Sequence, residues 1–375
     1  MYTKENVIKI AKRNNNIKRS YLLVNPLQAK HVPVSPTKSL DMMNELGRIL
    51  KEKYPKTRLV IGFAETATAI GASVANCFEN CIYVQTTREK MQAEDNCLIF
   101  AEEHSHAVEQ KLSTANLRQA LKNTDTVVFI DDEISTGKTL INIINQMRNE
   151  FDMLSSKQIV VASIINRVSE EKLEMLKNAS IECEQLVKIT HDDYDSMLSE
   201  LDTIPPKKAE SKFDSAPMLF DRLPLQNPRR CVDISQYTNS CISVANSVIN
   251  QISHRLHSAK RVLVLGTEEC MYPALILGRE LEKSYSECRV FCHATTRSPI
   301  EALNEGDYPI KNGYQIHSFY DNDRVTFLYN ISSYDYVIVV TDAPCVNKNG
   351  INDIAQLFSL KDDENYCLVK GEENV

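Results

Sequence analysis

The 375-residue sequence lacks the features that identify membrane, secreted and nucleic-acid-binding proteins. It contains no apolar run of roughly 18 residues that would predict a transmembrane helix, and residues 1–6 form no apolar signal region. It also has no basic run with interleaved aromatic residues, and its formal net charge is −7. We therefore expect a cytoplasmic protein with no membrane partner and no nucleic-acid partner.

The patterns of zinc sites are missing as well. The 11 cysteines are scattered, and the two pairs spaced four apart, Cys77 with Cys81 and Cys288 with Cys292, belong to no C-x-x-C set. The 8 histidines include no H-E-x-x-H motif. Scattered cysteines with mostly apolar neighbours are typical of reduced core residues in a cytoplasmic protein.

Composition and the distribution of proline predict two domains. Hydrophobic residues make up 43% of the chain and charged residues 25%, as in an ordinary globular protein, and 375 residues is long for one domain. Five prolines fall within residues 202–230, where no helical or strand periodicity is visible. We therefore predict a domain at residues 1–201, a partly extended linker at 202–230 and a second domain at 231–375.

Continuous apolar strands alternate with helices in the N-terminal domain. Apolar runs occupy residues 59–64, 81–85, 127–130 and 159–165, and the sequence predicts a helix rich in small residues at 66–78. Strands of this kind, separated by helices, are typical of a parallel sheet covered on both faces. The sequence thus predicts an α/β fold whose ligands bind at the carboxyl ends of the strands.

One segment, residues 127–139, carries the strongest chemical signal. Four apolar residues run into three acids, Asp131, Asp132 and Glu133, and a turn of small residues then leads into a helix. Such a turn offers backbone N–H groups to a phosphate, while paired carboxylates accept hydrogen bonds from vicinal ribose hydroxyls or hold a hard cation. Two alternatives are a P-loop, which would need a glycine where Asp132 stands, and a surface strand with an accidental acidic end.

This segment resembles the phosphoribosyl diphosphate (PRPP) signature of type I phosphoribosyltransferases, in which an apolar strand and two acids precede a hydroxyl- and glycine-bearing loop. In this interpretation Asp131 and Asp132 bind the ribose and hold Mg²⁺. The loop would bind the 5′-phosphate through backbone and hydroxyl groups, and its residues are Ser135, Thr136, Gly137, Lys138 and Thr139. Mg²⁺ is therefore the expected cofactor, and PRPP is the expected co-substrate.

The leaving diphosphate needs a turn of backbone amides and a cation. In the resembling family this turn follows the first core strand, which here places Ala64, Glu65 and Thr66 at the start of a helix. Glu65 is unusual beside an anion and would act through Mg²⁺ or contact the acceptor. Arg88, after the second strand, is the expected cation for the charge that develops on the diphosphate, with a solvated surface arginine as the alternative.

Two polar segments are candidates for the acceptor side of the site. One contains Glu103, His104 and His106, and the equivalent region of the resembling family is a mobile hood that closes over the substrate. A histidine there would give or take a proton at the accepting nitrogen. The other is a proline-bounded loop with Lys30 and His31, which we interpret as a cover over the acceptor, with a plain surface loop as the open alternative.

The C-terminal domain repeats the order of the N-terminal one. In each, a strand runs into Gly-x-x-Glu, a helix follows, a second strand leads to Thr-Thr-Arg, and a later strand ends in aspartate. We therefore hypothesise a diverged internal duplication without a working PRPP loop, although any two α/β domains can share such a pattern. The residues that would shape or share the acceptor pocket are Glu268, Glu269, Thr296 and Arg297.

Across residues 20–345 the chain resembles one particular subgroup of phosphoribosyltransferases. This subgroup is found with tellurium-resistance-associated biosynthetic genes and carries a C-terminal module named for a Thr-Arg-Ser-Pro motif, here residues 296–299. Ser135 stands where some purine-salvage relatives carry an aspartate, which argues against a hypoxanthine or guanine enzyme. The usual proline- and glycine-rich diphosphate turn is also replaced, by residues 64–68.

These observations together predict a Mg²⁺-dependent phosphoribosyltransferase. It would move a phosphoribosyl group from PRPP to a nitrogenous base or base-like acceptor and release diphosphate, and we expect a homo-oligomer, with a dimer as the predicted form. Two alternatives stay open: a non-catalytic PRPP or nucleotide sensor, and a reverse reaction that strips a base from a nucleotide. The residues do not identify the acceptor.

Overall fold

The computed structural model describes residues 1–15, 19–91, 96–100, 109–189, 194–210 and 214–371. Contacts divide the chain into two compact units. The N-terminal unit consists of Met1–Lys4, Asp41–His191 and Asn227–Asn239, and the C-terminal unit consists of Glu5–Leu40, Asp192–Gln226 and Ser240–Val375. The division falls within three of the described helices, α1 (Lys4–Val7), α2 (Pro36–Lys53) and α8 (Ile234–Leu256).

This grouping differs in several places from the division drawn from composition. Residues 5–40, placed by composition in the N-terminal domain, are grouped with the C-terminal unit. Residues 202–230, predicted as a linker, contain β10 (Lys207–Lys208), β11 (Met218–Leu223) and the 3₁₀ turn η2 (Pro228–Arg230). Composition indicates where regular periodicity is weak, whereas compactness depends on contacts between segments that are distant in the sequence.

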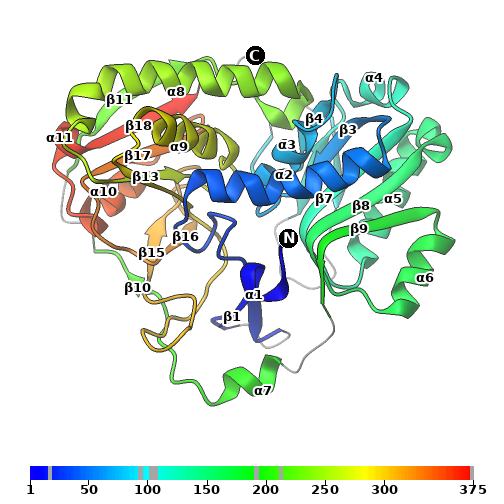
Figure 1. Ribbon diagram of the computed structural model, residues 1–375, viewed down its shortest axis with the longest axis horizontal. Helices are drawn as coiled ribbons and strands as arrows, with labels where there is room; N and C mark the ends of the chain where they lie inside the picture. Colours follow the sequence, from blue (N-terminus) through cyan, green and yellow to red (C-terminus); the bar gives the residue numbers. More distant parts are fainter. Residues whose placement is uncertain (16–18, 92–95, 101–108, 190–193, 211–213, 372–375) are drawn as a thin grey trace. The chain divides into compact units, whose positions relative to one another are not determined.

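A parallel sheet forms the centre of the N-terminal unit (Figure 1). Its described strands follow the order β12-β4-β3-β7-β8-β9, and each neighbouring pair is parallel except β12 with β4. Their bounds are β3 (Thr57–Gly62), β4 (Ile82–Gln85), β7 (Thr126–Ile134), β8 (Gln158–Asn166), β9 (Ile181–Lys188) and β12 (Val232–Asp233). The predicted α/β fold with parallel strands is confirmed.

Helices cover the sheet, and this explains why β3, β8 and the first part of β7 are mostly apolar. α4 (Leu117–Lys122) and α5 (Lys138–Glu150) pack on the face that carries Leu59, Ile61 and Phe129. Val60 and Val128 alternate with that face and are also fully buried. α3 (Thr68–Ala75) lies close to β3. The remaining described elements of this unit are β5 (Cys97–Phe100), β6 (Gln110–Ser113), α6 (Glu170–Asn178) and the 3₁₀ turn η1 (Asp152–Ser156).

The C-terminal unit contains a second parallel sheet, in the order β11-β18-β17-β13-β14 among its described strands. Their bounds are β13 (Arg261–Gly266), β14 (Arg289–Ala294), β17 (Tyr336–Thr341) and β18 (Tyr366–Gly371). An antiparallel hairpin joins β15 (Gly313–His317) to β16 (Val325–Tyr329). Other described elements are α1 (Lys4–Val7), β1 (Lys9–Lys12), β2 (Tyr21–Val24), α7 (Tyr194–Ser199), α9 (Tyr272–Ser284), α10 (Lys348–Leu357) and α11 (Asp362–Asn365).

Within the described part of the chain, none of the helices has both the length and the apolar character needed to cross a bilayer.

Candidate active site

The turn after β3 is held at the carboxyl end of the N-terminal sheet by both neighbouring strands. The Phe63 amide donates to the Ile130 carbonyl of β7 at 3.0 Å, and the Ala64 amide donates to the Thr86 hydroxyl at 2.8 Å. Glu65, the next residue, is buried. These contacts fix the backbone that leads into α3 beside the end of β7.

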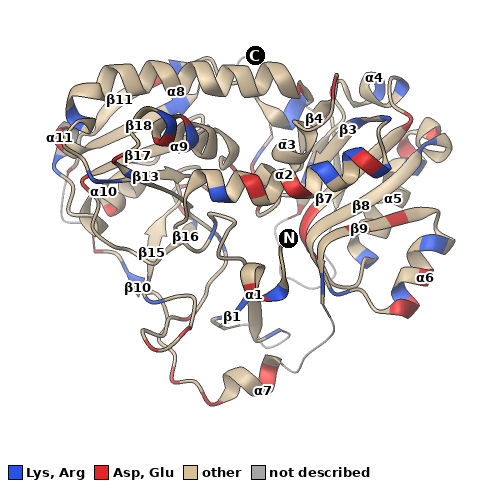
Figure 2. Cartoon of the chain, viewed as in Figure 1, with Lys and Arg blue, Asp and Glu red and all other residues tan. Residues whose placement is uncertain are grey.

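The turn also reaches the strand-end acids directly. The Thr66 hydroxyl donates to Asp132 Oδ1 at 2.8 Å, and the Asp132 amide donates to Asp131 Oδ1 at 2.9 Å. Both aspartates are half-buried. They lie at the acidic end of β7, which is red in Figure 2. The structure therefore brings together two groups of residues that the sequence predicted separately, the turn after β3 and the acids of β7.

The surroundings of Asp132 favour its neutral form. Loss of water around the carboxyl group raises the pKa of Asp132, and the nearby Glu133 charge raises it further, whereas the Thr66 hydrogen bond lowers it. A cation, or a ligand with hydroxyl donors, would favour the charged form instead. This end of β7 is thus suited to a ligand that brings donors or positive charge.

The predicted 5′-phosphate loop forms the turn between β7 and α5. Gly137 occupies the N-cap position with a φ of +72°, and a Cβ there would lie 3.3 Å from Leu176. Because glycine has no side chain, it cannot cap the first amides of this 13-residue helix. Exposed or half-buried members of the turn and first helical turn are Ser135, Thr136, Lys138 and Thr139. Gly137 itself is buried, and the Lys138 amide donates to the Thr136 hydroxyl at 3.4 Å.

Arg88 is half-buried after β4, and a second cation that sequence reasoning missed contacts the preceding residue. Arg229 Nε donates to the Thr87 hydroxyl at 3.1 Å, although 142 residues separate the two. Arg229 belongs to η2, in the segment that returns to the N-terminal unit after the proline-rich region. In the sequence, Arg229 is visible only as part of a basic pair directly after Pro228. This pair cannot be assigned to the site without knowing that the chain returns to the N-terminal unit there.

A buried ion pair ties the ends of β7 and β8 together next to the loop. Glu133 Oε1 lies 3.1 Å from Arg167 Nη1, and the two side chains are 12% and 3% exposed. The Arg167 amide donates to the Ile134 carbonyl at 2.8 Å. Sequence reasoning grouped Glu133 with the acids of β7 but gave it no partner, because nothing in the spacing connects it to Arg167.

The predicted hood lies in the sequence between β5 and β6, the strands of a hairpin. Thr87 and Lys111 exchange two backbone hydrogen bonds of 2.8 Å, so the hairpin starts from the end of β4. Glu103, His104 and His106 lie outside the described residues, and their roles stay predictions.

Residues predicted from the C-terminal half meet around a buried carboxylate in the C-terminal unit. Glu268 is fully buried, and its Oε2 accepts from Arg297 Nε at 2.7 Å. Arg324 Nη2 lies 3.0 Å from the same oxygen, and Ser318 donates to Oε1 at 2.5 Å. Sequence reasoning missed Arg324 and Ser318. The other predicted residues of this region, both buried, are Glu269 and Thr296.

Lys30 and His31, predicted as a cover over the acceptor, lie in the C-terminal unit. Lys30 is fully buried, and its Nζ donates to the carbonyls of Glu268 at 2.7 Å and Thr295 at 2.9 Å. His31 is also buried, and its carbonyl accepts from Asn330 Nδ2 at 3.1 Å. Lys30 therefore fastens the N-terminal segment to the turn after β13, and His31 fastens it to the residue after β16.

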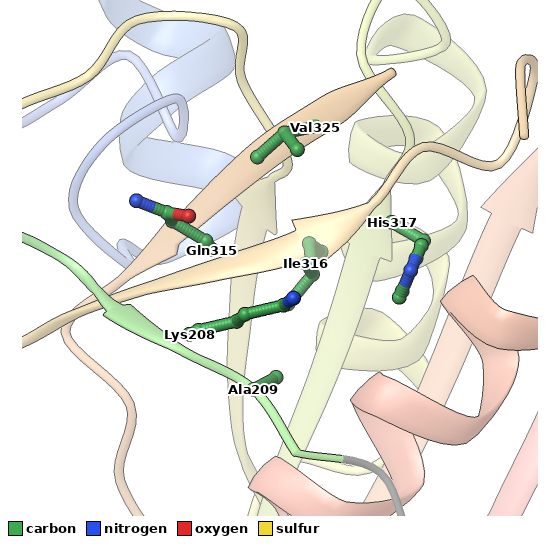
Figure 3. A pocket seen from close by; sticks show the side chains of 6 residues that line it. All are labelled: Lys208, Ala209, Gln315, Ile316, His317 and Val325. Atoms are coloured by element: carbon green, nitrogen blue, oxygen red, sulfur yellow. The ribbon is translucent and has the colours of Figure 1, made fainter. Parts of the chain in front are cut away.

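A small hollow in the C-terminal unit lies beside the hairpin of β15 and β16 (Figure 3). Beside it, His317 Nδ1 lies 2.7 Å from Asp353 Oδ2. The residues that line the hollow are Lys208, Ala209, Gln315, Ile316, His317 and Val325. None of the residues predicted from the sequence lines it.

Two protein families match the sequence of this chain. Residues 7–192 match a family described as phosphoribosyl transferase, and residues 235–358 match the TRSP domain, described as lying C-terminal to that transferase. The chain matches no curated protein sequence.

Several solved structures resemble part of the chain at low sequence identity. The adenine phosphoribosyltransferase of Giardia lamblia, complexed with 9-deazaadenine, is 16% identical over 48% of this chain and 94% of its own, with a TM-score of 0.35. The Trypanosoma brucei enzyme, in complex with AMP, pyrophosphate and ribose-5-phosphate, is 16% identical over 42% and 70%, with a TM-score of 0.31. Orotate phosphoribosyltransferase of Francisella tularensis is 12% identical over 49% and 79%, with a TM-score of 0.28. These likenesses are too distant to bear on ligand or reaction.

Proposed function

Because this chain belongs to the phosphoribosyl transferase family and carries the TRSP domain that follows it, we propose that its N-terminal unit moves a phosphoribosyl group from PRPP to a nitrogenous base or base-like acceptor and releases diphosphate. The observation that carries this proposal is the hydrogen bond from Thr66 to Asp132. It joins the turn after β3 to the acids of β7. PRPP presents a ribose between two phosphate-bearing ends, and the N-terminal unit offers acids between two amide-bearing turns.

The ribose would lie against the end of β7. Ionised carboxylates accept hydrogen bonds and donate none, so Asp131 and Asp132 suit the vicinal hydroxyls of a ribose. Donation from these hydroxyls would stabilise the charged form of Asp132, whose pKa is raised by burial in the absence of such donors. Binding of the ribose would therefore favour the ionised form of Asp132, and the ionised form would in turn favour binding of the ribose.

The 5′-phosphate would lie at the start of α5. Unsatisfied amides and the helix dipole favour an anion at a helix N-terminus. Gly137, with its positive φ and no Cβ, lets the backbone approach the phosphate closely. The hydroxyls of Thr136 and Thr139 add donors from half-buried positions.

The diphosphate would lie over the turn after β3. Ala64 has a one-carbon side chain, which leaves room for an anion above the amides that lead into α3. Arg88 supports this placement, because charge builds on the leaving group as the bond to the sugar breaks and a positioned cation lowers the barrier. Arg229, on the Thr87 hydroxyl, would add positive charge to the same region.

The residues present fit a role for Mg²⁺ that is shared with the substrate. Among the described residues, no three histidine, cysteine or acidic side chains converge as a metal-holding group. Mg²⁺ needs no such cage, since it is commonly bound by one or two carboxylates together with substrate phosphates. Asp131 and Asp132 would hold it with the oxygens of PRPP. When bound, the ion neutralises charge on the departing diphosphate.

On the acceptor side, His104 or His106 would transfer the proton at the accepting nitrogen. A histidine close to neutral pH can take this proton as the bond to the sugar forms. Which base accepts the sugar is a question for a substrate screen.

Release of diphosphate tests the proposal. The purified chain is incubated with PRPP, Mg²⁺ and a panel of nucleobases and base-like metabolites, and the products are examined for the mass gain of one ribose phosphate. We expect turnover with at least one acceptor, and its loss when Asp131→Asn is combined with Asp132→Asn. Asp125→Asn, at the exposed opposite end of β7, is the matched control and should retain activity. PRPP binding without turnover on any acceptor would contradict the proposal.

A further inference from the structure

The two units share the order of their central strands. The N-terminal unit has β4-β3-β7-β8 and the C-terminal unit has β14-β13-β17-β18, so each places its first strand between the second and the third. Every neighbouring pair in both sets is parallel. In both, an antiparallel hairpin lies between the second and third strands in the sequence. This is the arrangement that the duplication hypothesis predicts.

Hydrogen bonds at the ends of these strands match pair by pair. In each unit, the amide after the final glycine of the first strand donates to the third strand at 3.0 or 3.1 Å. The next amide donates to a threonine hydroxyl at 2.8 or 2.9 Å. The matched donors are Phe63 and Ala64 in one unit and Thr267 and Glu268 in the other. Ala64 therefore corresponds to Glu268.

The segment after the second strand matches as well. Thr87 and Thr296 each form a backbone bridge with the second strand of the hairpin, β6 or β16. Arg88 and Arg297 follow these threonines directly. Arg297 is thus the counterpart of Arg88, the cation that we assign to the diphosphate.

In the C-terminal unit a carboxylate fills the position that corresponds to the diphosphate. Where Ala64 ends after one carbon, Glu268 extends a carboxylate that Arg297 contacts at 2.7 Å and Arg324 at 3.0 Å. Ser318 completes the set at 2.5 Å. Because Glu268 is fully buried, an incoming anion would have to displace it.

A hydroxyl group fills the position that corresponds to the ribose. The Ile130 carbonyl in one unit and the Val340 carbonyl in the other accept the matched hydrogen bonds. An aspartate lies two residues after each carbonyl, Asp132 in the N-terminal unit and Asp342 in the C-terminal unit. Asp342 accepts a hydrogen bond from the Tyr320 hydroxyl, at the tip of the hairpin between β15 and β16. Asp132 accepts from the hydroxyl of Thr66 in the adjacent turn, whereas the hydroxyl on Asp342 is a phenol that comes from the hairpin tip.

An asparagine fills the position that corresponds to the 5′-phosphate. The helix after the third strand is α5 in one unit and α10 in the other. α5 follows Gly137, whereas α10 follows Asn347, whose Oδ1 accepts from the Asn349 amide at 3.0 Å. Asn347 Nδ2 donates to the Ser318 carbonyl at 3.0 Å, which ties this cap to the hairpin tip.

We propose that the C-terminal unit holds a site of the PRPP type that the protein fills with its own groups. The Glu268 carboxylate stands for the diphosphate, the Tyr320 hydroxyl for the ribose and the Asn347 side chain for the 5′-phosphate. Because these groups belong to the chain itself, their effective concentration at the site is very high, and a free ligand would have to compete with them. The wild-type unit therefore binds no PRPP. It becomes a site for a diphosphate-class anion when Glu268 is removed, because Arg297 and Arg324 lose their shared carboxylate.

Calorimetric titration with inorganic diphosphate and Mg²⁺ tests this inference, which depends on the proposed function only for the ligand of the N-terminal unit. Glu268→Ala should bind one more diphosphate per chain than the wild type does. Adding Arg297→Ala should abolish the gain, and Glu268→Gln, which keeps the space filled, should not produce it. A folded Glu268→Ala protein with the wild-type stoichiometry would overturn the inference. If the wild type binds none and Glu268→Ala binds one, the N-terminal proposal fails while this one stands.

Hydrogen exchange on the wild type gives a second test, which does not depend on whether a variant folds. At saturating diphosphate and Mg²⁺, amide exchange of peptides that cover residues 266–269 and 318–324 should remain as in the free protein. Slower exchange there in the wild type would show that the C-terminal site is open, and the inference would be wrong. Residues 62–66 serve as the internal comparison.

Discussion

The turn after β3 and the turn after β13 share the hydrogen bonds that hold their first two residues, yet they differ in what surrounds them. Around the first, Asp131 and Asp132 are half-exposed, and α5 begins at a glycine. Around the second, Glu268 is fully buried between two arginines, and α10 begins at a capping asparagine. The comparison teaches that the strand order creates a place for an anion, while a few side chains decide whether a ligand or the protein occupies it.

The largest effect that separates the two units should come from the strand-end acids. Replacing Asp131 and Asp132 together with asparagine removes the charged acceptors for the ribose, and we expect the turnover number to fall by about a thousandfold or more. Asp342→Asn, the counterpart in the C-terminal unit, should leave the rate within about twofold, because its partner is Tyr320 rather than substrate. Steady-state release of diphosphate measures both. Equal losses in the two proteins would remove the distinction between the units.

Replacing the two matched arginines, Arg88 and Arg297, should have different effects on stability and on PRPP binding. Arg297→Ala leaves the buried Glu268 short of a partner, and we expect it to lower the free energy of unfolding by about 3–5 kcal/mol. Arg88→Ala should change stability little but raise the KM for PRPP by about tenfold or more, because a charge-assisted contact to substrate is lost. Urea unfolding and PRPP kinetics on both variants separate the two losses. A large loss of stability in Arg88→Ala with an unchanged KM would assign it a structural role.

Acid should destabilise the C-terminal unit through a buried histidine. Burial, with a smaller contribution from Lys30, lowers the pKa of His293 to about 4, whereas an unfolded chain has a histidine pKa of about 6.5. Between these values the unfolded state binds the proton and the folded state does not, so stability falls as the pH drops through this window. The loss should approach about 3 kcal/mol. His293→Gln should flatten the dependence in urea unfolding between pH values of about 7 and 4, and an unchanged slope would contradict the assignment.

Asp132 in the N-terminal unit should act in the opposite direction. Its raised folded-state pKa means that the folded state keeps the proton at pH values where the unfolded state has lost it. Its contribution to stability is therefore lost as the pH rises through that interval. Urea unfolding of Asp132→Asn over the same pH range should no longer show this loss of stability with rising pH. It should still show the loss of stability at low pH that His293 causes.

The smallest expected effect concerns two glycines with positive φ. Gly137→Ala places a Cβ 3.3 Å from Leu176 at a φ of +72°, and we expect a cost of about 1–2 kcal/mol and a raised KM for PRPP. Gly306→Ala, at a φ of +50° with nothing within 4 Å of its Cβ, carries a similar backbone cost without a neighbour to displace. It should leave the KM unchanged. A KM change of equal size in both would mean that the effect reports global stability rather than the loop.

Local patterns in the sequence were sufficient for the central strands of the two sheets and for the end of β7. The apolar runs that became β3, β7 and β8, and the acids that end β7, are contiguous signals, so periodicity and spacing predict them. The glycine at the start of α5 is visible for the same reason.

Contacts between distant residues could not be predicted in this way. Arg229 reaches Thr87 across 142 residues, and Arg324 reaches Glu268 only because the hairpin of β15 and β16 brings its tip to the turn after β13. Lys30 shows the same difficulty. A lysine beside a histidine in a proline-bounded loop suggests a polar cover, but the long-range fold buries its ammonium group against two carbonyls of the C-terminal unit.

A crystal structure of the chain soaked with PRPP and Mg²⁺ would test the central claim most directly. The account predicts one PRPP per chain in the N-terminal unit, with its 5′-phosphate on the amides of residues 135–139 and its ribose hydroxyls on Asp131 and Asp132. PRPP bound at Glu268 and Arg297, or held elsewhere with the end of β7 empty, would contradict it.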